Sequence, residues 1–255
     1  MNAKKVPRGK AGGLARIRVH GNPGTTAGRR LGGLNSLKTH NSRKTGFKVL
    51  RPIKNPLNSS ELAELLGILA GDGHLGVYQA TVTTNSDTDR EHAEYIKMLC
   101  EKLFSVPVRI SYRKKQKACV VVVSSKEVCR FLARKGMTQG HKIRSGMHMP
   151  PWVQARKVFR LAFIRGLFDT DGSVYVDIHQ IKGRIYKNIA MMFSNRCLPL
   201  LADFKSTLES VGLHPTQKTK YAVFLRRKKE IQQYFKLIGF SNSKHKRKIL
   251  AHFVS

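Results

Sequence analysis

Two aspartates in this chain are candidates for metal chemistry. Asp72 and Asp171 lie 99 residues apart, and each precedes a glycine at the end of an apolar stretch. A carboxylate at a helix C-terminus faces the negative end of the helix dipole, which costs on the order of 0.3–1 kcal/mol. The chain has only 15 Asp and Glu residues, so two acids in matching places need a shared reason. A bound divalent cation would supply it, and we predict that both hold Mg²⁺ through oxygen ligands and water.

The apolar stretches before the two acids can bring them together. Gly67 and Gly71 are four residues apart, and Gly166 and Thr170 occupy the matching places in the second stretch. Small residues at this spacing allow two helix backbones to approach closely. We therefore expect these four residues at a helix interface, with Gly71 and Thr170 also part of the metal site. Such a paired site suits hydrolysis of a phosphodiester, in which metal activates water and stabilises the leaving oxygen.

The elements expected around the two acids repeat along the chain. In the first copy we expect helices over Leu62–Gly71, Glu91–Phe104 and Lys126–Arg134, and strands over Val77–Asn85, Val108–Tyr112 and Ala118–Val123. In the second copy we expect helices over Phe159–Phe168, Leu198–Val211 and Glu230–Ile238, and strands over Val174–Ile181, Ile185–Phe193 and Lys218–Leu225. The repeat predicts an α/β (α+β) fold made by duplication.

Both acids lie in sequences that resemble a known motif. Leu65–Gly73 and Ile164–Gly172 resemble the two motifs of the LAGLIDADG homing endonucleases of the single-chain, two-motif type. In that family the metal-binding acid is the eighth position, and both copies keep it. The first copy departs from the pattern at the sixth position, where Ala70 replaces the acid that the second copy keeps as Asp169. The resemblance covers about residues 61–255.

This resemblance implies both a fold and an activity. Residues 58–152 and 153–255 would form two pseudo-symmetric αββαββα halves, whose four-stranded sheets form a saddle over double-stranded DNA. The implied activity is that of a site-specific DNA endonuclease that uses Mg²⁺, with Mn²⁺ as a substitute, held by one Asp from each motif helix. It would cut both strands across the minor groove and leave 3′ overhangs. Because the halves differ in sequence, we expect a long asymmetric target and a monomeric enzyme.

Other functions remain open for the same scaffold. One is an RNA maturase that binds intron RNA during splicing, and another is a DNA-binding regulator without catalysis. Relatives of that kind typically lose a motif acid, whereas this chain keeps both. We expect a free-standing, intron-encoded protein rather than an intein, because the chain starts with Met1-Asn2 and lacks a His-Asn end.

The charge of the chain favours a polyanionic partner. It has 48 Lys and Arg residues against 15 acids, a formal net charge of +33 over 255 residues, which points to nucleic acid. No apolar run reaches the roughly 18 residues of a membrane span, and the N-terminus lacks the apolar core of a signal peptide. The four cysteines form no CxxC pair and are interpreted as buried free thiols. We expect a cytoplasmic (bacterial or archaeal) or organellar protein that is neither secreted nor membrane-bound.

Residues 1–57 form a basic, glycine-rich N-terminal arm. The first 60 residues contain 14 Lys and Arg, nine Gly and no Asp or Glu. Two interpretations remain open. The arm is either a solvated, disordered tail such as an organelle transit peptide, or a segment that clamps DNA and becomes ordered on binding.

Alternation along the expected strands and helices separates buried from polar faces. We place Tyr78, Ala80, Val82, Val108, Ile110, Tyr112, Ile185, Ile189, Met191 and Phe193 on buried strand faces, and Tyr95, Met98, Leu99 and Leu103 on one helix face. The opposite strand faces carry Gln79, Thr81, Thr83, Arg109, Ser111, Arg113, Tyr175, Asp177, His179, Arg184, Tyr186 and Asn188. Arg, Gln and Asn can hydrogen-bond base edges in the major groove. We predict that this set binds DNA; the alternative is a polar sheet surface facing solvent.

Four further polar residues are candidates for auxiliary roles in catalysis. Asn85 and Asn195 follow the long strands, and Lys126 and Lys229 match each other in the repeat. The family resemblance implies that residues near these places help to position water and phosphate. Each could instead cap a helix or make a simple phosphate contact.

Overall fold

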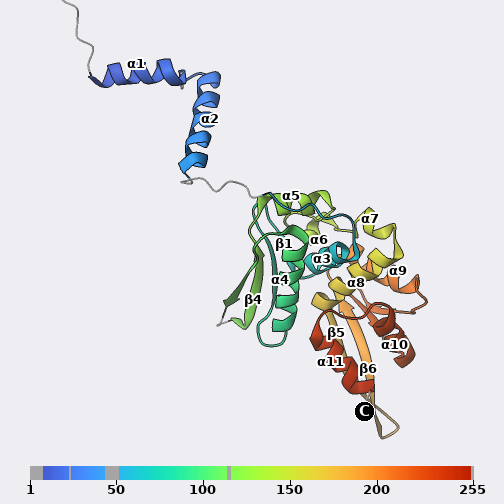
Figure 1. Ribbon diagram of the computed structural model, residues 1–255. Coiled ribbons are helices and arrows are strands. Elements are labelled where there is room, and N and C mark those ends of the chain that lie inside the picture. The colour runs from blue at the N-terminus through green and yellow to red at the C-terminus, as the bar shows by residue number, and fades with distance from the viewer. Residues whose placement is uncertain (1–7, 23, 44–51, 114–115, 254–255) are drawn as a thin grey trace, which may run out of the picture. The chain divides into compact units, whose positions relative to one another are not determined.

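The computed structural model describes residues 8–22, 24–43, 52–113 and 116–253. The chain divides into two compact units, Met1–Val49 and Leu50–Ser255 (Figure 1). The first unit contains two helices, α1 (Arg8–His20) and α2 (Thr26–Arg43). Among the described residues, no helix is both long and apolar enough to cross a membrane.

The first half of the larger unit contains one four-stranded antiparallel sheet. Its elements are α3 (Ser60–Ala70), β1 (Gly73–Leu75), β2 (Ala80–Asn85), α4 (Arg90–Phe104), β3 (Arg109–Arg113), β4 (Ala118–Val123), α5 (Lys126–Arg134), α6 (Lys142–Ser145) and α7 (Pro151–Gln154). The strand order is β1-β2-β4-β3. The Ser59 hydroxyl accepts a hydrogen bond from the Leu62 amide and so fixes the start of α3.

The second half repeats this arrangement. Its elements are α8 (Lys157–Asp171), β5 (Gly172–Ile181), β6 (Arg184–Ser194), α9 (Leu198–Glu209), β7 (Thr216–Thr219), β8 (Ala222–Leu225), α10 (Lys228–Leu237) and α11 (Ser243–Phe253). The strand order is β5-β6-β8-β7, the same as in the first sheet. The duplicated mixed α/β fold with two four-stranded sheets is thereby confirmed.

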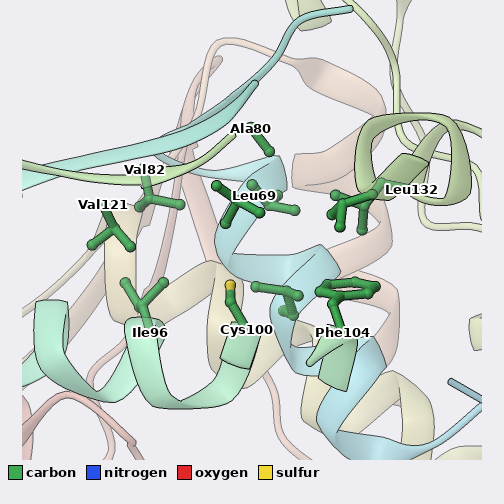
Figure 2. Close-up of a pocket in the computed structure, with 11 residues that line it drawn as sticks. Leu69, Ala80, Val82, Ile96, Cys100, Phe104, Val121 and Leu132 are labelled. Atoms are coloured by element: carbon green, nitrogen blue, oxygen red, sulfur yellow. The ribbon is translucent and has the colours of Figure 1, made fainter. Parts of the chain in front are cut away.

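The core lies between the helices and one face of each sheet. In the first half, apolar side chains from α3, α4 and α5 meet those of β2 and β4, and all are buried (Figure 2). The close-up labels Leu69, Ala80, Val82, Ile96, Cys100, Phe104, Val121 and Leu132. This interior has no polar lining and is packing rather than a ligand site. All four cysteines are buried and free.

Four residues expected on buried faces are exposed instead. Tyr78 is 66% exposed because β2 begins only at Ala80, so that Tyr78 lies in the connection from β1. Met98 is 60% exposed, since it lies opposite the buried face of α4. Tyr112 is 46% exposed at the edge strand β3, and Ile185 is 67% exposed near the tip of the β5–β6 hairpin. In the hairpin, the alternation continues past the helices that cover the sheet.

Several short elements were not expected from the sequence. The strand β1 has only three residues and is separated from β2 by Gly76–Gln79. The helices α6 and α7 have four residues each, and α11 follows the last expected helix. The elements β1, α6 and α7 contain too few residues to show a period, whereas α11 has 11 residues and was missed at the end of the second copy.

Candidate functional site

The helices α3 and α8 pack closely along their glycines. A Cβ atom built on Gly67 would lie 2.0 Å from the Phe163 carbonyl oxygen, and one on Gly166 would lie 2.2 Å from the Glu64 carbonyl oxygen. At the end of the contact, a Cβ on Gly71 would lie 1.9 Å from Thr170 Oγ1. All four small residues therefore lie at the interface of the two helices. Close backbone contact here leaves no room for larger side chains.

The two acids meet where these helices end. Asp72 follows α3 and directly precedes β1, while Asp171 is the last residue of α8 and directly precedes β5. Their carboxyl groups interact with each other. Burial, and then the charge of Asp72, raises the pKa of Asp171 to about 7. Burial of its carboxyl also raises the pKa of Asp72. Asp72 as a whole nevertheless remains exposed to solvent.

Lys142 is a charged partner of this pair that the sequence did not reveal. It begins the short helix α6, and its ammonium group donates hydrogen bonds to the Leu69 carbonyl at 3.2 Å and to the Gly71 carbonyl. Burial lowers the pKa of Lys142, while the charges of Asp171 and Asp72 raise it. A cation beside two carboxyls offsets their mutual repulsion. No spacing rule links Lys142 to acids so distant in the sequence.

The four auxiliary candidates lie in different settings. Asn195 Nδ2 donates to Asp171 Oδ2 at 2.6 Å, so this side chain holds one acid directly. Asn85 Oδ1 instead accepts from the Asp87 and Thr88 amides at 2.8 and 3.0 Å. The side-chain oxygen of Asn85 is therefore engaged in the turn that precedes α4. No described contact joins Asn85 to Asp72.

The two lysine candidates are likewise not brought to the acids. Lys126 lies at the start of α5 with its ammonium 5.4 Å from the Tyr78 ring centroid. Lys229 is exposed on α10. Among the described contacts, neither joins Asp72 or Asp171. The cation at the carboxyl pair is Lys142.

The polar residues expected to bind DNA in the first half share one sheet face. Thr81 of β2 and Arg109 of β3 both pair with Val122 of the central strand β4. Thr83 of β2 and Ser111 of β3 both pair with Val120 of β4. Directly paired residues lie on the same face. Arg113 of β3 lies two residues beyond Ser111 on the same face and pairs with Ala118 of β4. Gln79 lies just before β2, where its amide donates to Ser124 Oγ at 3.2 Å.

The second half presents a longer polar face. Asp177 pairs with Asn188, His179 pairs with Tyr186, and Tyr175 and Arg184 continue the same face along β5 and β6. The His179 and Tyr186 rings stack with centroids 5.6 Å apart. An ion pair of 3.6 Å joins Asp177 to Arg226, next to the end of β8.

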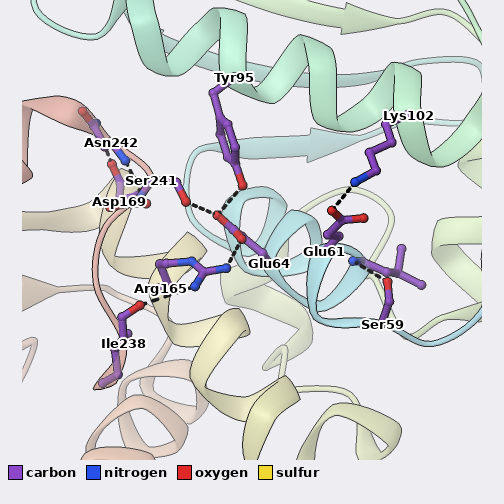
Figure 3. A network of polar contacts seen from close by, with 11 residues as sticks. Ser59, Glu61, Glu64, Tyr95, Lys102, Arg165, Asp169, Ile238, Ser241 and Asn242 are labelled. Atoms are coloured by element: carbon purple, nitrogen blue, oxygen red, sulfur yellow. Dashed lines mark hydrogen bonds and ion pairs between the residues drawn. The ribbon is translucent and has the colours of Figure 1, made fainter. Parts of the chain in front are cut away.

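A buried polar network ties the two halves together behind the carboxyl pair. Glu64 of α3 is only 1% exposed and pairs with Arg165 of α8, while it accepts hydrogen bonds from Tyr95 and Ser241 (Figure 3). Asp169 Oδ2 accepts from the amides of Ser241 and Asn242. These contacts come from α3, α4, α8 and the segment before α11. They restrict the mutual position of the motif helices, because displacing either helix would break buried hydrogen bonds, although Arg165 Nε and Asp169 Oδ1 have no hydrogen-bond partner among the described residues.

The donor set at the carboxyl pair fits a hard divalent cation. Two adjacent carboxyls supply oxygen ligands, and burial followed by the charge of Asp72 raises the pKa of Asp171, so a bound cation would favour the ionised form of the pair. The Gly71 carbonyl oxygen lies near Asp171 but accepts a hydrogen bond from the Lys142 ammonium, so it could bind the same ion only if that ammonium moved aside. The described residues contain no cluster of three or more His, Cys, Asp or Glu.

Comparison with known families finds a match within the second half. Residues 158–249 match the family model described as a LAGLIDADG-like domain. The matched residues run from the start of α8 to α11 and include Asp169 and Asp171.

Solved structures share this architecture at low sequence identity. The meganuclease I-SmaMI bound to uncleavable DNA aligns with a TM-score of 0.51 and 10% identity, covering 73% of this chain and 87% of that one. A K262A mutant of I-SmaMI aligns with a TM-score of 0.52 and 11% identity, covering 75% and 88%. I-DmoI in complex with DNA and Mn aligns with a TM-score of 0.46 and 19% identity, covering 71% and 97%. These likenesses describe the fold alone.

Two curated archaeal proteins match most of this chain. One is the tRNA-splicing ligase RtcB of Methanopyrus kandleri, 21% identical over 210 residues that cover 73% of this chain. The other is the replication factor C small subunit of Methanocaldococcus jannaschii, 26% identical over 215 residues that cover 81%. The matches span only 21% and 11% of these relatives. Their names therefore describe proteins much longer than the part that aligns.

Proposed function

We propose that this protein is a site-specific double-strand DNA endonuclease that works with a divalent metal. The observation that carries the proposal is the Asp72–Asp171 carboxyl pair at the ends of two tightly packed helices. Each acid directly precedes the first strand of a sheet whose uncovered face bears polar side chains. The family of residues 158–249 and the net charge of +33 support the same conclusion. DNA bound across both sheets would place its backbone at the acids.

The residues at the site have distinct proposed roles. Asp72 and Asp171, with the Gly71 carbonyl and the backbone at Thr170, would hold Mg²⁺ or Mn²⁺. When bound, such an ion supplies a water of lowered pKa and neutralises charge on the leaving oxygen. Asn195 fixes the orientation of the Asp171 carboxylate through its hydrogen bond. Lys142 brings positive charge to the place where a phosphate would approach.

The finer features of the proposed reaction are those that the family resemblance implies. One acid from each half serves a strand of the duplex, so a monomer would cut both strands. The resemblance to the homing endonucleases supports cuts across the minor groove that leave 3′ overhangs. Because the sheet faces of the two halves carry different residues, the target would be long and asymmetric.

The substitutions Asp72→Asn and Asp171→Asn test this assignment. Each removes a charge that metal needs but preserves size, so we expect cleavage to fall at least a hundredfold while duplex binding stays within about threefold. Asp87→Asn, on the exposed turn before α4, is the matched control and should cleave normally. Full cleavage by either site variant would refute the metal assignment. Binding without cleavage by the wild-type protein would favour a maturase or a regulator, with intron RNA as the next ligand to test.

A further inference from the structure

The N-terminal unit is a pair of helices joined at a fixed elbow. The Asn22 carbonyl accepts from the Thr25 amide at 3.2 Å and from the Thr25 hydroxyl at 2.9 Å. Thr25 Oγ1 in turn accepts from the Gly28 amide at 3.0 Å. A Cβ on Gly28 would lie 1.5 Å from the Asn22 carbonyl oxygen, so only glycine fits there. The angle between α1 and α2 is thus set locally by the sequence of the turn.

The described part of this unit, residues 8–22 and 24–43, has no hydrophobic core of its own. Among the described residues of α1 and α2, only Gly28 is buried, and it has no side chain. Leu14, Leu31, Leu34 and Leu37 are 42–50% exposed. A segment of this length buries too little apolar surface to offset the entropy of ordering it. A partner is therefore needed to stabilise the two helices.

The chemistry of the unit points to one class of partner. Residues 1–49 contain 12 Lys and Arg and no acid, which favours a polyanion. The basic and apolar residues are not separated onto opposite faces; Arg30 and Lys38, for example, each lie four residues from Leu34 on α2 and so share its face. A helix that lies on a membrane surface would segregate them. Charge distributed around both helices instead suits a duplex, because the two phosphate backbones flank a helix that lies in or across a groove.

We infer that the α1–α2 unit is a second DNA-binding element, which contacts the phosphate backbone outside the sequence bound by the two sheets. This inference rests on the proposed function only in that both involve the same duplex. The 16 residues between α2 and α3 can span at most roughly 55 Å. The unit is thus held at high effective concentration beside bound DNA. It adds affinity without adding sequence preference, because phosphate contacts carry no base information.

The test is the salt dependence of binding by the full chain to a mixed-sequence duplex. The variant replaces three exposed basic residues of α2, as Arg29→Gln, Arg30→Gln and Lys38→Gln. Each lost phosphate contact lowers the slope of log K against log salt by about 0.9, so we expect the slope to fall by up to about 2.7. The control replaces three lysines on the helices that cover the sheets, as Lys97→Gln, Lys102→Gln and Lys205→Gln. It removes the same charge and should leave the slope unchanged.

The outcomes separate this inference from the proposed function. An unchanged slope in the α2 variant, with wild-type DNA binding intact, would overturn the inference alone. A wild-type protein that binds no duplex at any salt would overturn both. Loss of cleavage with a normal α2 contribution to the slope would overturn only the proposed function. Wild-type residues 1–49 should also resist trypsin when duplex is added; protection by anionic phosphatidylglycerol vesicles but not by duplex would overturn the inference in favour of a membrane surface.

Discussion

At the scale of single residues, corresponding places in the two motif helices differ in a way that affects stability. Ala70 is buried at the end of α3, and its counterpart Asp169 is 2% exposed in α8. Burial raises the pKa of Asp169 to about 8, against two backbone hydrogen bonds that lower it. Its Oδ1 atom has no hydrogen-bond partner among the described residues. At neutral pH the folded protein therefore holds this carboxyl largely protonated.

The substitution Asp169→Asn tests whether this buried carboxyl makes the free energy of unfolding depend on pH. In the unfolded chain the carboxyl ionises near pH 4, whereas in the folded protein it keeps its proton to about pH 8. Stability associated with the proton is therefore lost as the pH rises between these values. We expect the free energy of unfolding of Asp169→Asn, relative to wild type, to increase by about 1–3 kcal/mol from pH 5 to pH 8. Denaturant titrations at both pH values measure it, with Asp87→Asn as the control. A constant difference would contradict the account.

At the scale of elements, the contact between α3 and α8 determines where the acids lie. The sequence predicted a close contact between these two helices, because each contains small residues at a spacing of four. The acid that follows these residues in each copy is also visible in the sequence. Lys142 could not be predicted, because its position depends on α6, a four-residue helix with no period of its own. Asn85 was assigned a catalytic role by its position, but its side chain is occupied by the turn before α4. Local chain geometry of this kind leaves little trace in a single sequence.

The substitution Gly67→Ala tests the helix contact. Its methyl group would overlap the Phe163 carbonyl, so the helices must separate. We expect the free energy of unfolding to fall by at least about 2–3 kcal/mol, with a parallel loss of cleavage. Gly33→Ala in α2, where a Cβ would meet nothing within 4 Å, should have no destabilising effect. Circular dichroism during urea unfolding provides the comparison. Equal stability of the two variants would contradict close packing at Gly67.

At the scale of the whole molecule, the two halves share a topology but present sheets of different length. The β5–β6 ladder has ten paired positions, whereas β1–β2 has three. At about 3.4 Å per residue, the second hairpin reaches roughly 24 Å further. The sequence predicted the duplication and both long strands of the second half. It did not predict that Val176, Ile178 and Ile185 are exposed, because alternation reports the face of a strand and not where the covering helices end.

The longer hairpin should make the second half more selective at the outer end of its DNA site. His179→Ala combined with Tyr186→Ala removes the stacked pair next to the hairpin tip. We expect base preference at the outer positions of one side to fall by roughly tenfold, within the 1–3 kcal/mol typical of a base-pair mismatch. Thr81→Ala combined with Arg109→Ala should instead change the other side. Binding selections from a randomised duplex library give both profiles, and identical changes would refute the separate roles of the halves.

The most direct test of the central claim is a cleavage selection with the wild-type protein. Purified protein would be incubated with Mg²⁺ and a randomised duplex library, and the ends of cut molecules would be sequenced. The account predicts a long, asymmetric consensus with staggered 3′ ends, and no cuts when EDTA replaces Mg²⁺. Absence of cuts with Mg²⁺ and with Mn²⁺, while the protein still binds duplex, would contradict it.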